Sequence, residues 1–232
     1  MIKAVFFDLY HTLVTYDPPQ EELEARALKE LGVDVQPSAL RGPIVTADEF
    51  IYNEIANRPL SHRSKEEKLA LYMQYQETVL REAAVPYDTG LVMGLLGKMQ
   101  QTTMNLVLFD DVSPTLTALK KRGLILGLIS NIEQDIGATL NRLGLPSWLE
   151  IIVTSQDAGA NKPQPEIFLE ALRRAAVQPD EALYIGDQYH VDVVGANGAG
   201  MQGILLDRNN HYQKIKDCPK IQSLTRVSGF LE

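Results

Sequence analysis

Four polar residues stand where apolar, strand-like runs of the sequence end, or in the loops that follow: Asp8, Ser130, Lys162 and Asp187. Asp8 and Asp187 are carboxylates, which repel each other in a dry cleft unless a cation lies between them. Mg²⁺ suits hard oxygen ligands of this kind, together with the oxygens of a phosphate group. Lys162 is a point charge for an anion, and Ser130 with the backbone N–H of Asn131 can donate hydrogen bonds to phosphoryl oxygens. If these residues meet, they form a site for a magnesium ion and a phosphorylated ligand.

Each of these residues also has an ordinary structural explanation when it is taken singly. Asp8 and the pair Gly186-Asp187 are of the types that form turns. Ser130-Asn131 is a plausible helix N-cap, and Lys162 is of the type that occurs in solvated loops. The combination and its order along the chain favour the functional interpretation.

The segments that must position these residues alternate between strands and helices from about residue 106 onward. This alternation predicts right-handed crossovers and an α/β fold with a doubly wound parallel sheet. The carboxyl ends of parallel strands lie along one edge of the sheet, where open α/β sheets bind ligands. The expected strands are 3–7, 124–129, 151–153, 183–185, 203–206 and 220–222, and the expected helices are 113–123, 136–143, 166–175 and 193–199.

After the first strand the hydrophobic pattern stays helical for about 90 residues, and no strand is expected there. Pro18-Pro19 open the first helix, and a loop carrying Arg41-Gly42-Pro43 follows it. Further on, Ser64 and Glu67 are spaced as a capping box. The simplest interpretation of this long helical stretch is an inserted α-helical domain. The expected division is 1–14 with 106–232 for the α/β core and 15–105 for the insert.

Composition narrows the possible functions. The 232 residues include 30 Asp and Glu against 22 Lys and Arg, a formal net charge of −8. This balance argues against an extended nucleic-acid surface, although a local pocket can still bind an anion. The single cysteine, Cys218, excludes an internal disulfide and is consistent with a reducing cytosol. No leader pattern or membrane-spanning run is expected, so we predict a cytoplasmic protein. The oligomeric state is left open.

Four segments of the sequence carry a resemblance to a known family. They are Phe7-Asp8-Leu9-Tyr10-His11-Thr12-Leu13, Ile129-Ser130-Asn131, Lys162-Pro163 with Pro165, and Gly186-Asp187 with Asp192. In these segments the sequence resembles the haloacid dehalogenase superfamily of hydrolases, in the subfamily that inserts an α-helical cap after the first motif. The resemblance implies a Rossmann-like core, a nucleophilic Asp8, and a small substrate, enclosed by the cap, that bears a phosphoryl group or a halogenated carbon.

The resemblance also implies roles for the other motif residues. Ser130 and Lys162 would hold the transferred group. Asp187, with Asp192 behind it, would hold Mg²⁺ together with Asp8 and the backbone carbonyl of Tyr10, so that all four are expected metal residues. We further expect Thr12 to brace the loop that carries the nucleophile by hydrogen bonding.

The chain departs from the family's phosphatases at Tyr10, where they usually carry a second aspartate. That aspartate protonates the leaving oxygen and then activates water, whereas the family's dehalogenases have tyrosine there, and a departing halide needs no proton. Those dehalogenases work without metal, and their fourth motif generally lacks the Gly-Asp pattern that Gly186-Asp187 preserves here. We therefore predict a Mg²⁺-dependent phosphatase that acts on a small phosphorylated metabolite through an aspartyl-phosphate on Asp8. The alternatives are a metal-free 2-haloacid dehalogenase with the same nucleophile, and a weakly active protein that binds a phosphorylated ligand or a partner.

Three residues have open roles. Tyr10 could shape the pocket or donate a hydrogen bond. His11 could replace the missing acid, since imidazole titrates near neutrality, or be a turn histidine. Arg41 could reach an anionic substrate from its loop, or be a solvated loop arginine.

Overall fold

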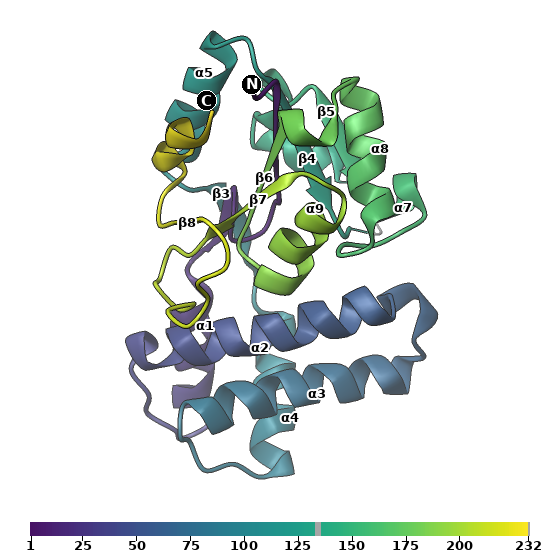
Figure 1. Ribbon diagram of the computed structural model, residues 1–232. Coiled ribbons are helices and arrows are strands. Elements are labelled where there is room, and N and C mark those ends of the chain that lie inside the picture. The colour runs from purple at the N-terminus through teal and green to yellow at the C-terminus, as the bar shows by residue number, and fades with distance from the viewer. Residues whose placement is uncertain (133–135, 232) are drawn as a thin grey trace. The chain divides into compact units, whose positions relative to one another are not determined.

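The computed structural model describes residues 1–132 and 136–231 (Figure 1). The chain divides into an α/β unit, Met1–Thr15 with Val107–Glu232, and a helical unit, Tyr16–Leu106. The chain passes between the two units twice, and at each of these crossings the boundary differs by one residue from the expected division. Short strands β2 (Val14–Asp17) and β3 (Asn105–Leu108) occupy the two crossings and pair in a two-stranded sheet.

The expectation that no strand follows the first one before about residue 106 was wrong because of β2 and β3. Each has four residues and is only partly buried, unlike the fully buried β1. Their pairing joins segments far apart in the sequence, so neither strand can be recognised from its own residues.

The α/β unit contains a six-stranded sheet in the order β5-β4-β1-β6-β7-β8, and all of its strand pairs are parallel. The predicted fold class is confirmed. The strands are β1 (Ala4–Phe7), β4 (Ile125–Ser130), β5 (Ile151–Thr154), β6 (Ala182–Gly186), β7 (Gln202–Leu206) and β8 (Lys220–Ile221). The helices are α5 (Val112–Lys121), α6 (Gly137–Arg142), α7 (Ser155–Ala158), α8 (Pro165–Ala175) and α9 (Gly195–Gly198), with short helical turns at Leu145–Ser147, Pro179–Glu181, Tyr189–Val194 and Leu224–Phe230.

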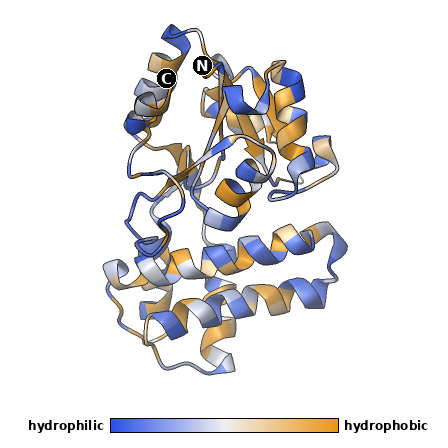
Figure 2. Ribbon diagram, in the orientation of Figure 1, coloured by the Kyte–Doolittle hydropathy of each residue, from blue (hydrophilic) through white to orange (hydrophobic). Residues whose placement is uncertain are grey.

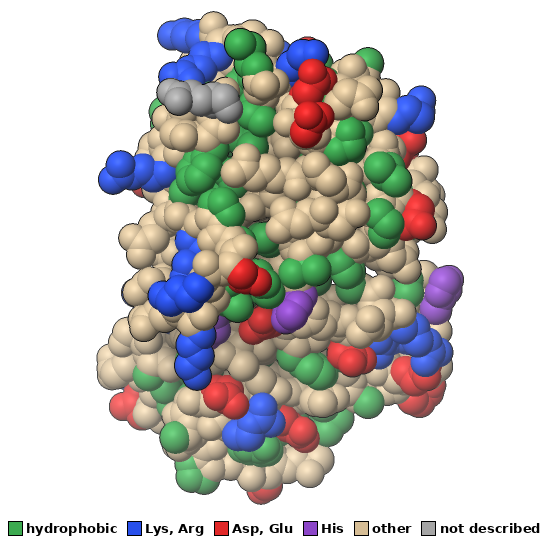
Figure 3. Space-filling model, viewed as in Figure 1, with side chains coloured by type: hydrophobic (Ala, Val, Ile, Leu, Met, Phe, Trp, Pro, Cys, Tyr) green, Lys and Arg blue, Asp and Glu red, His purple; other side chains and the backbone are tan. Residues whose placement is uncertain are grey.

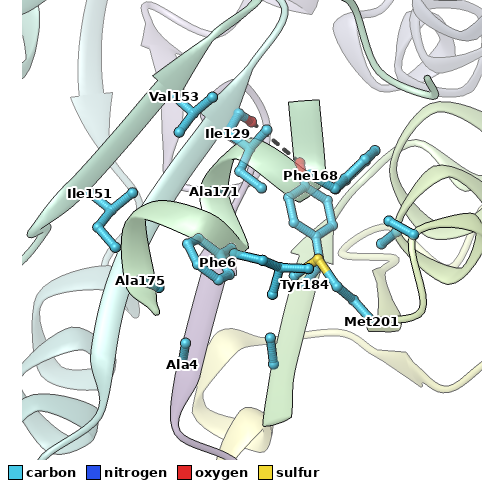
Figure 4. Close-up of a cluster of buried hydrophobic side chains, with 14 of the residues drawn as sticks. Ala4, Phe6, Ile129, Ile151, Val153, Phe168, Ala171, Ala175, Tyr184 and Met201 are labelled. Atoms are coloured by element: carbon cyan, nitrogen blue, oxygen red, sulfur yellow. Dashed lines mark hydrogen bonds between the residues drawn. The ribbon is translucent and has the colours of Figure 1, made fainter. Parts of the chain in front are cut away.

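Strand β1 is central in the sheet and fully buried, as its continuous apolar run predicts. Side chains of α8 pack on the neighbouring strands in the cluster drawn in Figure 4. In this cluster the rings of Phe168 and Tyr184 meet edge to face, with centroids 5.1 Å apart. The Tyr184 hydroxyl points out of the apolar cluster toward the Ile129 carbonyl, 3.3 Å away (Figure 4). The Tyr184 hydroxyl is therefore a polar group at the boundary of the apolar cluster, near the carboxyl ends of the strands.

The helical unit is formed by four helices with a common apolar interior. They are α1 (Gln20–Glu30), α2 (Pro37–Asn57), α3 (Lys65–Glu82) and α4 (Thr89–Gln101), with a short turn at Leu60–His62. Leu28, Ile44, Val79 and Leu95 belong to the interior. Figure 2 shows hydrophobic and hydrophilic residues interspersed along these helices, as in helices that bury one face. The predicted capping box is confirmed, because the Ser64 hydroxyl accepts from the Glu67 N–H and the Glu67 carboxylate accepts from the Ser64 N–H.

The predicted loop at Arg41-Gly42-Pro43 was wrong, because α2 continues through it. Proline lacks an N–H and would normally end or kink a helix at such a position. On either side of it, however, Leu40 and Ile44 are buried in the interior of the helical unit. This packing outweighs the local preference.

A group of buried polar side chains interrupts that interior. Gln20 Nε2 donates to Glu24 Oε1 (2.9 Å) and to the Tyr75 hydroxyl (2.7 Å). Tyr75 in turn donates to Asp48 Oδ1 (2.9 Å). Glu24 is fully buried, and its Oε2 has no hydrogen-bond partner in the described part of the chain. Burial raises the pKa of Glu24 to about 7; the Gln20 hydrogen bond lowers it, and the charges of Asp48 and Glu21 raise it.

We expect Glu24→Gln to remove part of the pH dependence of stability. The folded pKa of about 7 lies above the ordinary 4.5, so between these values the folded protein binds more protons than the unfolded chain. The stability supplied by protonated Glu24 is complete below pH 4.5 and is lost as the pH rises through about 7. At about 1.4 kcal/mol per pKa unit, the loss amounts to about 3 kcal/mol of unfolding free energy.

Urea unfolding at pH 5 and pH 8 measures this difference. Glu24→Gln should be less sensitive to pH than the wild type, while the control Glu30→Gln, at an exposed position of α1, should keep the wild-type sensitivity. An unchanged pH dependence in Glu24→Gln would contradict the assignment.

Charges of both signs are interspersed on the molecular surface drawn in Figure 3. Some form exposed ion pairs, such as Arg58–Glu67 (2.7 Å) and Lys120–Glu150 (2.7 Å). Such pairs contribute little to stability. Within residues 1–132 and 136–231, every helix is too short or too polar to cross a membrane.

Candidate active site

The carboxyl ends of three adjacent strands bring polar residues together in the α/β unit. Asp8 directly follows β1, Ser130 is the last residue of β4, and Asp187 directly follows β6. Strand β1 pairs in parallel with both β4 and β6, with Phe7 opposite Leu128 and Ile185. These three of the four residues singled out in the sequence therefore lie at one edge of the sheet.

Lys162 completes the group from the loop before α8. Its ammonium donates to Asp8 Oδ1 (2.6 Å), Asp192 Oδ1 (2.7 Å) and the Tyr184 hydroxyl (2.8 Å). An ammonium has three N–H donors, so these contacts use all of them. Lys162 can contact a substrate oxygen only by giving up one of these bonds. Its first role is to hold two carboxylates, a role that the sequence analysis did not assign to it.

Asp192 lies on the π-helical turn Tyr189–Val194, a geometry often found at functional sites. Its Oδ1 accepts from Lys162 and from the Tyr184 hydroxyl (3.0 Å), and its Oδ2 accepts from the Gln188 N–H (2.9 Å). A Cβ at Gly186 would lie 2.3 Å from the Asp192 carboxyl carbon, so glycine is needed there for the carboxylate to pack against the strand. Both oxygens of Asp192 are thus committed to protein donors.

The Asn131 side chain fixes the backbone of Lys162. Its Nδ2 donates to the Lys162 carbonyl (2.9 Å), and its Oδ1 accepts from the Lys162 N–H (2.6 Å). This paired contact joins the loop after β4 to the loop before α8. From the sequence, only the backbone N–H of Asn131 was expected to take part in the site.

The electrostatics of the cluster disfavour several ionised carboxylates at once. Burial raises the pKa of Asp8 from 3.8 to about 6, with Lys162 lowering it and the charge of Asp192 raising it. Burial and then the charges of Asp8 and Asp192 raise the pKa of Asp187 well above its ordinary value. Burial lowers the pKa of Lys162, but the charges of Asp192 and Asp8 more than offset this and raise it, so Lys162 stays a cation.

The carboxylate donors at this edge are of the type that a hard divalent cation prefers. Asp187 Oδ1 accepts from Thr12 Oγ1 at 3.4 Å, and Oδ2 accepts from Gln188 Nε2 at 3.0 Å. The protein cation Lys162 bonds Asp8 and Asp192, and its contacts do not include Asp187. The described residues contain no group of three or more His, Cys, Asp or Glu side chains arranged to hold a metal. Two carboxylates, a backbone carbonyl and water would suit magnesium, which commonly keeps several waters.

The remaining candidate site residues lie in the loop after β1 and in the helical unit. Thr12 is fully buried beside Asp187, and Tyr10 and His11 lie in the same loop, where His11 has a left-handed backbone conformation (φ 58°). Burial and then the charge of Asp8 raise the pKa of Tyr10. Arg41 belongs to the helical unit, where its Nε pairs with Glu21 Oε1 at 2.8 Å and its side chain is exposed.

Sequence reasoning missed Tyr184, whose hydroxyl contacts both Lys162 and Asp192. A tyrosine inside a buried apolar strand needs a hydrogen-bond partner, and this was the signal available in the sequence. The partners themselves could not be named, because both lie on other segments.

Comparisons with known proteins agree with this architecture. The family model for haloacid dehalogenase-like hydrolases matches residues 44–206. A glyceraldehyde 3-phosphate phosphatase of Methanothermobacter thermautotrophicus is 39% identical over 214 residues, which cover 89% of this chain and 86% of that protein. The glyceraldehyde 3-phosphate phosphatase of Methanopyrus kandleri is 31% identical over 221 residues, covering 93% and 88%.

The chain is also similar to a solved structure whose name gives a different activity, dehalogenation. The 2-haloacid dehalogenase of Pseudomonas syringae is 29% identical, with a TM-score of 0.59, and the match covers 100% of this chain and 98% of that one. Both kinds of enzyme belong to one family of hydrolases. From the family match, the extent of the alignments and the shared fold, this chain belongs to the haloacid dehalogenase-like hydrolases.

Proposed function

We propose that the protein is a Mg²⁺-dependent phosphatase that acts on a small phosphorylated metabolite. The observation that carries the proposal is the pair of carboxylates at adjacent strand ends, where burial and then the charge of Asp8 raise the pKa of Asp187. Halide displacement has no use for this second carboxylate, whereas a magnesium ion would relieve the repulsion. The two phosphatase relatives, at 39% and 31% identity, support the same conclusion.

In this proposal a carboxylate oxygen of Asp8 attacks phosphorus. The new O–P bond forms as the bond from phosphorus to the leaving oxygen breaks, and that oxygen takes up a proton. Water then attacks the phosphorus of the aspartyl-phosphate and gives a proton to the group that protonated the leaving oxygen. The bond from Asp8 to phosphorus breaks, which releases phosphate and restores the Asp8 carboxylate. Lys162 orients Asp8, while Ser130 and the backbone N–H of Asn131 donate to the phosphoryl oxygens.

The metal would be held by Asp8, Asp187 and the Tyr10 carbonyl, and when bound it would offset the charges of the carboxylates and the phosphoryl group. Asp192 would act by holding Lys162 and not as a direct ligand, since its Oδ1 already accepts hydrogen bonds from Lys162 and the Tyr184 hydroxyl and its side chain is only 1% exposed. Tyr10 is a candidate proton donor, because its hydroxyl carries a proton at neutral pH, although burial and then the charge of Asp8 raise its pKa and make it a weaker acid. His11 is the second candidate.

Release of inorganic phosphate from an aryl phosphate tests the proposal. The rate should depend on added magnesium and disappear with a chelator. The rival reaction is dehalogenation, favoured by Tyr10 and by the dehalogenase relative at 29% identity. Chloride release from 2-chloropropionate that persists with the chelator, without phosphate release in its absence, would replace the phosphatase assignment.

Tyr10→Asp should raise the phosphatase rate by at least about tenfold if proton transfer limits turnover, since a placed acid/base is worth about 10²–10⁴ in rate. Asp supplies a carboxyl group that can give and take the proton. Steady-state phosphate release in the wild type and the variant measures the change, with Tyr10→Phe as the matched control that removes the hydroxyl and adds no acid. A rate that does not rise in Tyr10→Asp would show that another group already transfers the proton.

A further inference from the structure

We define residues 8–13 as the nucleophile loop. Within it, Thr12 makes hydrogen bonds through both its side-chain hydroxyl and its backbone carbonyl. Its hydroxyl lies 3.4 Å from Asp187 Oδ1, on the side of the candidate metal ligands. Its backbone carbonyl accepts a hydrogen bond from Arg208 Nη2 at 2.9 Å. Arg208 follows β7 and is 196 residues away in the sequence.

The Arg208 guanidinium is itself fixed by several contacts. Its Nη1 and Nη2 donate to Asp111 Oδ2 and Oδ1 at 2.9 and 3.0 Å, a two-pronged pair with a carboxylate. Its plane lies over the Phe109 ring, 3.9 Å from the centroid. Asp111 Oδ2 also accepts from the Ser223 hydroxyl (2.8 Å) and the Leu224 N–H (2.9 Å).

This network lies mostly out of solvent, with side-chain exposures of 17% for Arg208 and 15% for Asp111. Partly buried, charge-assisted, bidentate pairs are among the stronger polar contacts. We call Arg208, Asp111 and Phe109 the anchor. The first residue of the loop is bonded to β6, through Asp8 N–H and the Ile185 carbonyl (2.9 Å), whereas amides further along the loop bond locally, such as Leu13 N–H to the Leu9 carbonyl (2.9 Å). Phe109 N–H also donates to the Leu13 carbonyl (3.1 Å), so the loop is tied to the anchor at two successive carbonyls.

We propose that Arg208 is a positioning residue for the reaction, which holds the nucleophile loop through the Thr12 carbonyl so that Asp8 and the Tyr10 carbonyl keep their placement. The role in turnover rests on the proposed phosphatase function. Lysine cannot replace this arginine, because one ammonium cannot span both Asp111 oxygens and the Thr12 carbonyl as the planar fork does.

Arg208→Lys should lower kcat for phosphate release by about ten- to a hundredfold, the size of effect caused by a small misplacement of catalytic groups, while KM stays within about twofold. Hydrogen exchange in the substrate-free protein should quicken at the His11, Leu13 and Val14 amides, all of which bond within the loop region. Arg174→Lys is the matched control, since Arg174 also joins a carboxylate, Glu170 (2.7 Å), to a backbone carbonyl, that of Ile152 (2.8 Å), away from the site. It should change neither kcat nor exchange in the loop.

The proposal is overturned if folded Arg208→Lys keeps wild-type kcat and loop exchange, or if Arg174→Lys shows the same losses. Should Arg208→Lys not fold, Asp111→Asn weakens the same anchor and should show the same pair of effects in smaller degree; wild-type behaviour in it would also overturn the proposal. Exchange is measured without substrate. A wild type with no phosphatase activity would therefore refute the proposed function, and loop exchange would still decide whether Arg208 orders the loop.

Discussion

Asp8→Asn should abolish phosphate release, with a loss of at least about 10⁴-fold, the scale on which enzymes lose activity when their nucleophile is removed. The carboxamide is uncharged and a poor nucleophile, so the aspartyl-phosphate cannot form. Lys162 keeps its contacts with Asp192 and the Tyr184 hydroxyl, which should preserve the cluster. One of several mutually repelling carboxylates is removed, so the folded protein should be at least as stable as the wild type in the presence of a chelator.

Phosphate release and thermal unfolding of Asp8→Asn measure the two expectations. Asp180→Asn, at an exposed position of the same unit, is the matched control and should leave both unchanged. Residual turnover within tenfold of the wild type would rule out Asp8 as the nucleophile.

Lys162→Met should cause the largest loss of stability. It leaves Asp8 and Asp192 buried, with side-chain exposures of 11% and 1%, and without their cation. Breaking a buried ion pair by removing one partner costs about 3–5 kcal/mol, because the remaining charge is uncompensated. Acid should restore much of this loss, because protonation removes the uncompensated charge: the folded variant takes up protons that the unfolded chain does not, so its stability rises as the pH falls.

Urea unfolding of Lys162→Met at pH 8 and pH 5 tests this expectation. The double variant Lys162→Met with Asp192→Asn should be more stable at pH 8 than Lys162→Met alone, because one charge is removed with its partner. Lys120→Met, which breaks the exposed pair with Glu150, should cost no more than about 1 kcal/mol at either pH. A loss of equal size at both pH values in Lys162→Met would refute the electrostatic explanation.

The helical unit shows which structural features can be predicted from short sequence motifs and which cannot. Ser64 and Glu67 were correctly identified as a capping box because the motif is closed within four residues. The continuity of α2 through Pro43 was not predictable, since it depends on the burial of Leu40 and Ile44 against other helices. Strands β2 and β3 were missed for a related reason, because each is defined by a partner far along the chain.

The sequence by itself determined the parallel α/β fold and the set of polar residues at its edge. Apolar runs that end in Asp8, Ser130 and Asp187 suffice for this, because parallel strands bring their carboxyl ends to one edge whatever the details of packing. Only the tertiary structure decided the partners: Lys162 with Asp8, Asp192 and Tyr184, the Asn131 side chain with the Lys162 backbone, and Arg208 with Thr12. These contacts join segments that are distant in sequence. They depend on side-chain directions and strand register, which residue type and spacing do not specify.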